Sequence, residues 1–163
     1  IWAGRVNILE LTGYAIQILP KLRIHEENVM EKLWLNADKT EHTSEILKTE
    51  NNSIWAGRVN ILELIGYAIQ ILPKLRIHEE NEMEMFYLNA GQGEHIDEVL
   101  EMKNSSIWAG RVKKLSFSDY AIEILPKLRI HGDNVMECFT LDADKTEHTS
   151  EILKTENNSI WAG

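Results

Sequence analysis

The sequence predicts an α/β fold in which three similar units stack into a solenoid. A motif that begins Ile-Trp-Ala-Gly recurs every 53 residues, at Ile1, Ile54, Ile107 and Ile160. Within each unit, short apolar stretches with strand-like alternation are followed by stretches that carry turn and helix signals, which is typical of stacked strand-and-helix repeats. We therefore expect one repeat domain over residues 1–163, with units at 1–53, 54–106 and 107–159 and the start of a fourth at 160–163.

Each unit contains two segments that predict strands. In the first unit, Leu9 and Leu11 stand in one segment and Leu33 and Leu35 in the other, each pair separated by one residue. Because successive side chains of a strand point to opposite faces, both members of a pair face the same side, and we expect that side to be buried. The predicted strands are parallel and lie near residues 6–11, 30–35, 59–64, 83–88, 112–117 and 136–141.

The stretches between the predicted strands carry signals for short helices. The segment HTSEILKTENN offers Thr43 or Ser44 as an N-cap residue and ends on the polar pair Asn51-Asn52. After the first strand of the unit, Gly13 permits a turn. The ring of Pro20 limits any longer helix there, because proline has no N–H to donate.

An all-α array of helical pairs is the alternative fold. Ile8, Leu11, Ala15, Ile18 and Leu22 also follow a period of about 3.6 residues, so the first half of the unit could form a kinked helix. The β-branched, glycine-containing segment RVNILELTGY argues against it. The alternation in EMFYL and ECFTL also favours strands.

The segments VNILELTGYAIQILPKL and MEKLWLNADKTEHTSEIL resemble the leucine-rich-repeat family. Both contain the strand motif Leu-x-x-Leu-x-Leu with Val or Met in first place, and the steps from Leu11 to Leu35 and from Leu35 to Leu64 are 24 and 29 residues. Tyr14 and Asp38 stand where the family has Asn. The resemblance is to the long repeats of the ribonuclease-inhibitor and NOD-like-receptor type. It implies convex-side helices and a concave strand face that binds ligands.

The outward positions of the predicted strands change chemistry between units, whereas the inward positions stay apolar. Inward Leu33, for example, is replaced by Phe86 and Phe139, as a core requires. Unselected variation at exposed sites would explain the outward changes, and so would a protein-binding face. The aromatic residues Trp34 and Tyr87 favour a binding face, because aromatic side chains anchor many interfaces. The expected binding-face residues are Glu10, Lys32, Trp34, Glu63, Met85, Tyr87, Lys114, Ser116, Cys138 and Thr140.

Composition and motifs argue against several other functions. The formal charge of −9 and the lack of an apolar run of about 18 residues exclude nucleic acid and membrane as expected partners. No histidine has a second His or Cys three or four residues away, so we expect no metal site. Phosphate-binding loops and nucleophile elbows are missing too. The sequence therefore predicts no enzyme, no cofactor and an incidental role for the single cysteine, Cys138.

Two repeated features are interpreted as parts of the repeat. A tryptophan follows the first isoleucine of every unit, which predicts a stacked core or a ladder between units. The segments IHEEN and TEHTSE place histidine beside carboxylates and predict solvated turns. Because neither end has a polar capping unit, head-to-tail self-assembly into oligomers or filaments is the alternative to a protein-binding scaffold. None of these features indicates a compartment.

Overall fold

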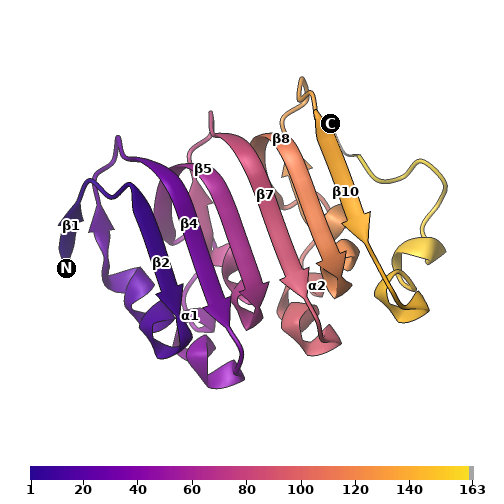
Figure 1. Cartoon of the computed structure of the whole chain (residues 1–163), viewed down its shortest axis with the longest axis horizontal. Helices are drawn as coiled ribbons and strands as arrows, with labels where there is room; N and C mark the ends of the chain where they lie inside the picture. Colours follow the sequence, from indigo (N-terminus) through magenta and orange to yellow (C-terminus); the bar gives the residue numbers. More distant parts are fainter. Residues whose placement is uncertain (162–163) are drawn as a thin grey trace.

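The chain folds around one open sheet of parallel strands (Figure 1). The computed structural model describes residues 1–161. Its main sheet has eight strands in the order β10-β8-β7-β5-β4-β2, with β6 added to β5 and β9 added to β8, and a separate pair joins β1 to β3. The strands are β1 (Trp2–Gly4), β2 (Ile8–Thr12), β3 (Arg23–Ile24), β4 (Val29–Ala37), β5 (Ile54–Gly66), β6 (Leu75–Ile77), β7 (Glu82–Ala90), β8 (Ile107–Asp119), β9 (Leu128–Ile130) and β10 (Cys138–Asp142).

Short helices connect the strands and lie behind and below the sheet in Figure 1. The three longest are 3-10 helices, and each contains a proline near its end, which prevents continuation as an α-helix. These are η1 (Gly13–Lys21), η3 (Tyr67–Lys74) and η5 (Tyr120–Lys127). The others are η2 (Thr40–His42), α1 (Ser44–Leu47), η4 (Gly93–Ile96), α2 (Asp97–Leu100), η6 (Thr146–His148) and η7 (Ile152–Lys154).

The predicted leucine-rich-repeat-like solenoid is wrong, and so is the all-α alternative. The structure is an α/β arrangement on a mostly parallel eight-stranded sheet that neither closes on itself nor winds into a solenoid. The predicted convex-side helices are reduced to the four-residue helices α1 and α2 and to 3-10 turns. The all-α alternative fails because the stretch with a helical period, which begins at Ile8, is a strand as far as Thr12 and a 3-10 helix from Gly13 to Lys21.

The six predicted strands each overlap a parallel strand of the sheet. Leu33 and Leu35 of β4 are 0% exposed, as predicted. Leu9 and Leu11 are only partly buried. The difference arises because β2 is the edge strand, so a neighbour covers its side chains on one side only.

The core lies between the sheet and the helical connections. Inward side chains of the central strands pack against apolar residues of η3 and η5, and Phe86 meets Phe117 edge to face with ring centroids 5.2 Å apart. Edge-to-face packing is a favoured aromatic geometry. The opposite face of the sheet carries no helix in Figure 1, so its side chains form an open surface of the molecule.

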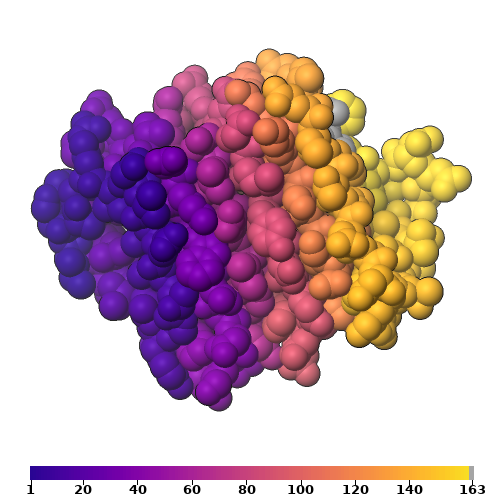
Figure 2. Space-filling model, in the orientation of Figure 1, coloured from indigo at the N-terminus to yellow at the C-terminus, as the bar shows by residue number. Residues whose placement is uncertain are grey.

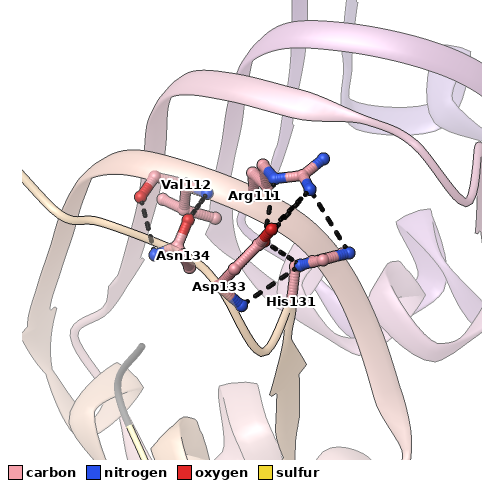
Figure 3. Close-up of polar contacts among 5 residues, drawn as sticks. All are labelled: Arg111, Val112, His131, Asp133 and Asn134. Carbon is pink, nitrogen blue, oxygen red and sulfur yellow. Dashed lines mark hydrogen bonds and ion pairs between the residues drawn. The ribbon is translucent and has the colours of Figure 1, made fainter.

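In every unit, a buried asparagine bonds the backbone close to the point where the first long strand segment joins the main sheet. The Asn81 side chain accepts a hydrogen bond from the Val59 N–H at 2.8 Å and donates one to the Val59 carbonyl at 3.2 Å. Asn134 bonds Val112 in the same way, at 2.8 and 3.1 Å (Figure 3). Asn28 makes the equivalent pair to the backbone of residue 6. Each asparagine amide thereby makes the two hydrogen bonds that a neighbouring strand would otherwise make to this backbone.

Candidate binding face

The helix-free face of the main sheet is organised into three rows of side chains. The strands pair in register, so equivalent positions lie side by side across six strands. The first row is Ile8, Lys32, Ile61, Met85, Lys114 and Cys138. The second row is Glu10, Trp34, Glu63, Tyr87, Ser116 and Thr140. The third row is Thr12, Asn36, Ile65, Asn89, Ser118 and Asp142.

The structure brings all ten predicted binding-face residues together in the first two rows. Figure 2 shows this face, over which the strands run as adjacent bands. Sequence reasoning missed the third row and left Ile8 and Ile61 out of the first. The signal for the third row is the same alternation, which continues for one more residue past each inward pair.

The centre of the face is apolar and aromatic. Ile61 lies beside Met85 in the first row, and in the second row Glu63 separates Trp34 from Tyr87. All five side chains are partly buried by their neighbours, so they are held in place and still present area to solvent. Such semi-rigid aromatic and apolar side chains lose little conformational entropy when they bind a partner.

Both lysines of the face are paired with carboxylates. The Lys32 ammonium lies 3.5 Å from the Glu63 carboxylate, and Lys114 lies 3.2 Å from Glu84. The hydrogen bond from Lys114 holds the pKa of Glu84 below its ordinary value. Lys113 also contacts Glu84, at 3.5 Å. Pairing of opposite charges leaves the centre of the face without a strong field of either sign.

The polar contacts of the face are local. The Asn89 amide donates to the Tyr87 hydroxyl at 3.1 Å, which orients the ring. The Cys138 thiol lies 3.4 Å from the Thr140 hydroxyl on the edge strand β10. Cys138 is exposed. Neither contact assembles a nucleophile with a base.

The tryptophans do not form the stacked core that the sequence predicts. Trp2 and Trp161 are 67% and 64% exposed, and Trp55 and Trp108 are half-buried. Trp55 lies edge-on to His78 and beneath the guanidinium of Arg76, which is 4.9 Å from the ring centroid. One contact does join units: the Trp108 indole N–H donates to the carbonyl of His78 at 3.4 Å.

The first histidine of each unit occupies a turn, as predicted. In the third unit, the Asp133 carboxylate accepts hydrogen bonds from Nε and Nη2 of Arg111, both at 3.2 Å, and contacts His131 (Figure 3). The guanidinium holds the pKa of Asp133 below its ordinary value. Because this cluster is exposed, it contributes little to stability. It connects one turn to the neighbouring strand.

The second histidine of each unit does not lie in the solvated turn that the sequence predicts. His42 and His148 are 6% and 2% exposed, and His95 is partly buried. Each packs edge-on against a tyrosine, with ring centroids 4.5 to 4.6 Å apart. His148 also faces two carboxylates, those of Asp119 and Asp144. The spacing of histidine and cysteine does not predict this cluster, because its local signal is Asp-x-x-x-His.

Family models, curated proteins and solved structures contain no match to this chain. The resemblance to leucine-rich repeats therefore stays a prediction from the residues. Among the described residues, none of the helices has the length and apolar character that a membrane crossing requires.

Proposed function

We propose that this chain is a non-catalytic scaffold that binds another protein through the three-row strand face. The observation that carries the proposal is the in-register row that places Trp34 and Tyr87 on either side of Glu63, next to Ile61 and Met85. Apolar and aromatic residues at the centre of a surface, with polar residues around them, are the usual composition of a protein interface.

The chemistry of the face indicates the kind of partner. Its lysines are already paired with carboxylates, and its centre is apolar. We therefore expect a partner segment with apolar side chains that fill the space around Trp34 and Tyr87, rather than a polyanion. Rim residues such as Ser116 and Asn89 can donate and accept hydrogen bonds at the edge of such a contact.

A peptide display library panned on the 163-residue chain tests the proposal. We expect the selected peptides to be apolar and to lose binding when Trp34 or Tyr87 is replaced by alanine, by about 1–3 kcal/mol each. Tyr14→Ala is the matched control, because Tyr14 is exposed outside the three rows. Peptides that bind all three variants as well as the parent chain would show that the face is not the binding surface.

A stability measurement must accompany this test. Leu33 lies next to Trp34 but is 0% exposed on the inward face, so Leu33→Ala should cost about 2–5 kcal/mol. Trp34→Ala should cost about 1 kcal/mol or less. If Trp34→Ala destabilises the chain as much as Leu33→Ala does, Trp34 belongs to the core. A loss of peptide binding would then reflect unfolding and not a lost contact.

Head-to-tail self-assembly is a second candidate, favoured by the two free edges of the sheet. Each of the pairs β4–β5 and β7–β8 joins the second strand of one unit to the first strand of the next. At the edges stand β10, the second strand of the third unit, and β2, the first strand of the first unit. Pairing of β10 with the β2 of another copy would repeat the same contact. It would also cover Phe139 and Leu141, which are 44% and 41% exposed.

Sedimentation at several concentrations tests the second candidate. Self-assembly predicts a weight-average mass that rises with concentration and a Phe139→Lys variant that stays monomeric, because a charge on an edge strand opposes pairing. Gly91→Lys adds the same charge at a position where a Cβ meets nothing within 4 Å. A mass that is independent of concentration would exclude self-assembly and leave the strand face as the proposed site.

A further inference from the structure

Two carboxylates and an imidazole converge at the carboxyl end of β8. Asp119 is the last residue of β8, Asp144 follows β10, and His148 ends η6. The Nδ1 atom of His148 lies 3.4 Å from Oδ1 of Asp119 and 3.4 Å from Oδ1 of Asp144. The three potential ligand atoms all lie within 4.8 Å of one another. Groups 29 residues apart in the sequence are therefore brought to one point.

The histidine of the cluster is buried, and its Nδ1 atom is unpaired. The His148 side chain is 2% exposed, and Nδ1 has no hydrogen-bond partner, a feature that His42 of the first unit shares. The Tyr120 ring packs edge-on against the imidazole at a centroid distance of 4.6 Å, which fixes the ring orientation. A buried polar atom without a partner costs free energy. Here that atom is directed into the space between two carboxylates.

The backbone conformation of Asp119 is also unusual. Asp119 has φ = +57°, a conformation in which the other two units have Gly13 and Gly66. Side-chain-bearing residues rarely adopt positive φ, and strained backbone of this kind clusters at functional sites. The third unit thus carries a carboxylate where the fold favours glycine, and that carboxylate is one of the two that face His148.

We propose that Asp119, Asp144 and His148 bind a divalent transition-metal ion, best matched by Zn²⁺. Imidazole nitrogen and carboxylate oxygen are both zinc ligands, with bonds of about 2.0–2.2 Å. Two such ligands on a tetrahedral ion are about 3.3 Å apart. The distances of 3.4 Å from Nδ1 to each carboxylate oxygen fit this ligand-to-ligand separation better than they fit a short hydrogen bond. The Asp144 side chain is 74% exposed, so water can supply the fourth ligand.

The other units provide internal controls. In the first unit, Asp38 and His42 repeat the Asp-x-x-x-His pair, with Nδ1 to Oδ1 at 3.1 Å, but the third position is Gly13. In the second unit, Gly91 replaces the aspartate and Gly66 occupies the third position. Among the described residues, only the third unit brings three ligand groups together.

Calorimetric titration of the chelator-treated chain with Zn²⁺ alone tests the proposal. We expect one tight site, and a loss of affinity of at least about 10- to 100-fold in Asp119→Gly and in Asp144→Asn. Asp38→Asn is the matched control and should leave the affinity unchanged. Asp119→Gly should fold, because it restores the residue of the other units, and Asp144→Asn gives a second measurement that leaves residue 119 unchanged.

A spectroscopic measurement separates the metal site from an ion pair. On metal binding, the ¹⁵N shift of His148 Nδ1 should move to the value of a coordinated nitrogen, whereas His42 should be unaffected. Three results would overturn the proposal: no Zn²⁺ binding by the parent chain, equal binding by both aspartate variants, or a ¹⁵N shift of His148 Nδ1 that does not change when Zn²⁺ is added.

Discussion

At the residue scale, the three units serve as comparisons for one another. The Gln17 amide donates to the Glu41 carbonyl at 2.6 Å, and the Gln70 amide donates to the Glu94 carbonyl at 2.9 Å. The third unit has Glu123 at the same position. A carboxylate cannot donate this hydrogen bond. The replacement of one nitrogen by oxygen therefore removes a stabilising bond from the third unit without changing its fold.

Glu123 is the first position at which this comparison gives a prediction. The side chain is 4% exposed, Oε1 accepts a bond from the Glu151 N–H at 3.2 Å, and Oε2 has no partner. Burial raises the pKa of Glu123 above its ordinary value. A carboxyl with a raised folded-state pKa loses stabilising free energy as pH rises through that pKa. Ionisation of Glu123 therefore destabilises the fold at neutral pH.

Glu123→Gln should raise the free energy of unfolding at neutral pH by about 1–2 kcal/mol, since a neutral donor replaces a buried charge. The gain should shrink at about pH 4 and below, where Glu123 is protonated in the parent chain. Urea unfolding of both proteins across this pH range measures the difference. A gain that does not change with pH would contradict the role assigned to ionisation.

Asn81 gives the second prediction at this scale. Asn81→Ala removes both hydrogen bonds to Val59 and leaves a buried N–H and a buried carbonyl unpaired, so it should cost about 2–4 kcal/mol of stability. Asn7→Ala removes an exposed amide that bonds Glu31 and should cost about 0.5 kcal/mol or less. Equal losses in urea unfolding would show that the buried amide does not fix the strand.

At the element scale, the junction between each long strand and the following 3-10 helix decides the path of the chain. Gly66 ends β5 with φ = +65° and starts the turn into η3. A Cβ at this position would collide with the carbonyl oxygen of Ala37 on the neighbouring strand. Glycine adopts this turn without strain, whereas Asp119, at the same position in the third unit, adopts the positive φ with a side chain.

Gly66→Ala should destabilise the chain by more than about 1 kcal/mol, because both the positive φ and the contact with Ala37 disfavour a side chain. Gly91→Ala is the matched control, since Gly91 has open space around its Cβ position. Thermal unfolding of the two variants checks this. A neutral Gly66→Ala would mean that the junction relaxes at no cost.

The elements also show what sequence reasoning can reach. Alternation at Leu33 and Leu35 predicts the strands and their buried face, because that pattern is local. The sequence predicts short helices whose length Pro20 limits, and the structure holds the longest of these connections in 3-10 geometry. The sequence predicts a solvated turn that includes Asn81, whose side chain is buried. Its partner, Val59, is 22 residues away, so the contact exists only after the strands pair.

At the scale of the whole molecule, the two ends of the open sheet differ from its middle. Strands β5 and β7 have neighbours on both sides, whereas β10 has one neighbour and is exposed at every position.

The two candidate sites differ in how far the sequence can predict them. The first two rows of the strand face follow from the alternation within one strand and from the repeat of that strand in every unit. The cluster of Asp119 with His148 could not, because it depends on which turn lies over the end of β8.

Amide hydrogen exchange should follow this gradient, slowest in β5 and β7 and fastest in β10, because local opening is easiest where few contacts must break. Mass spectrometry of exchanging peptides from a dilute solution measures it. Protection in β10 equal to that in β7 would contradict an uncovered edge. Protection in β10 that increases with protein concentration would show that another copy of the chain pairs with this edge strand.

The pairing of the long strands β5 and β8 allows whole units to be added or removed during evolution. Each begins beside a short strand of its own unit, β6 or β9, and continues beside the last strand of the unit before it. Unequal recombination between two copies of the repeat would delete or add 53 residues and leave both pairings in register. The number of strands on the proposed binding face can thus change by whole units, so the area of this face can grow or shrink without any change in the residues of a single unit.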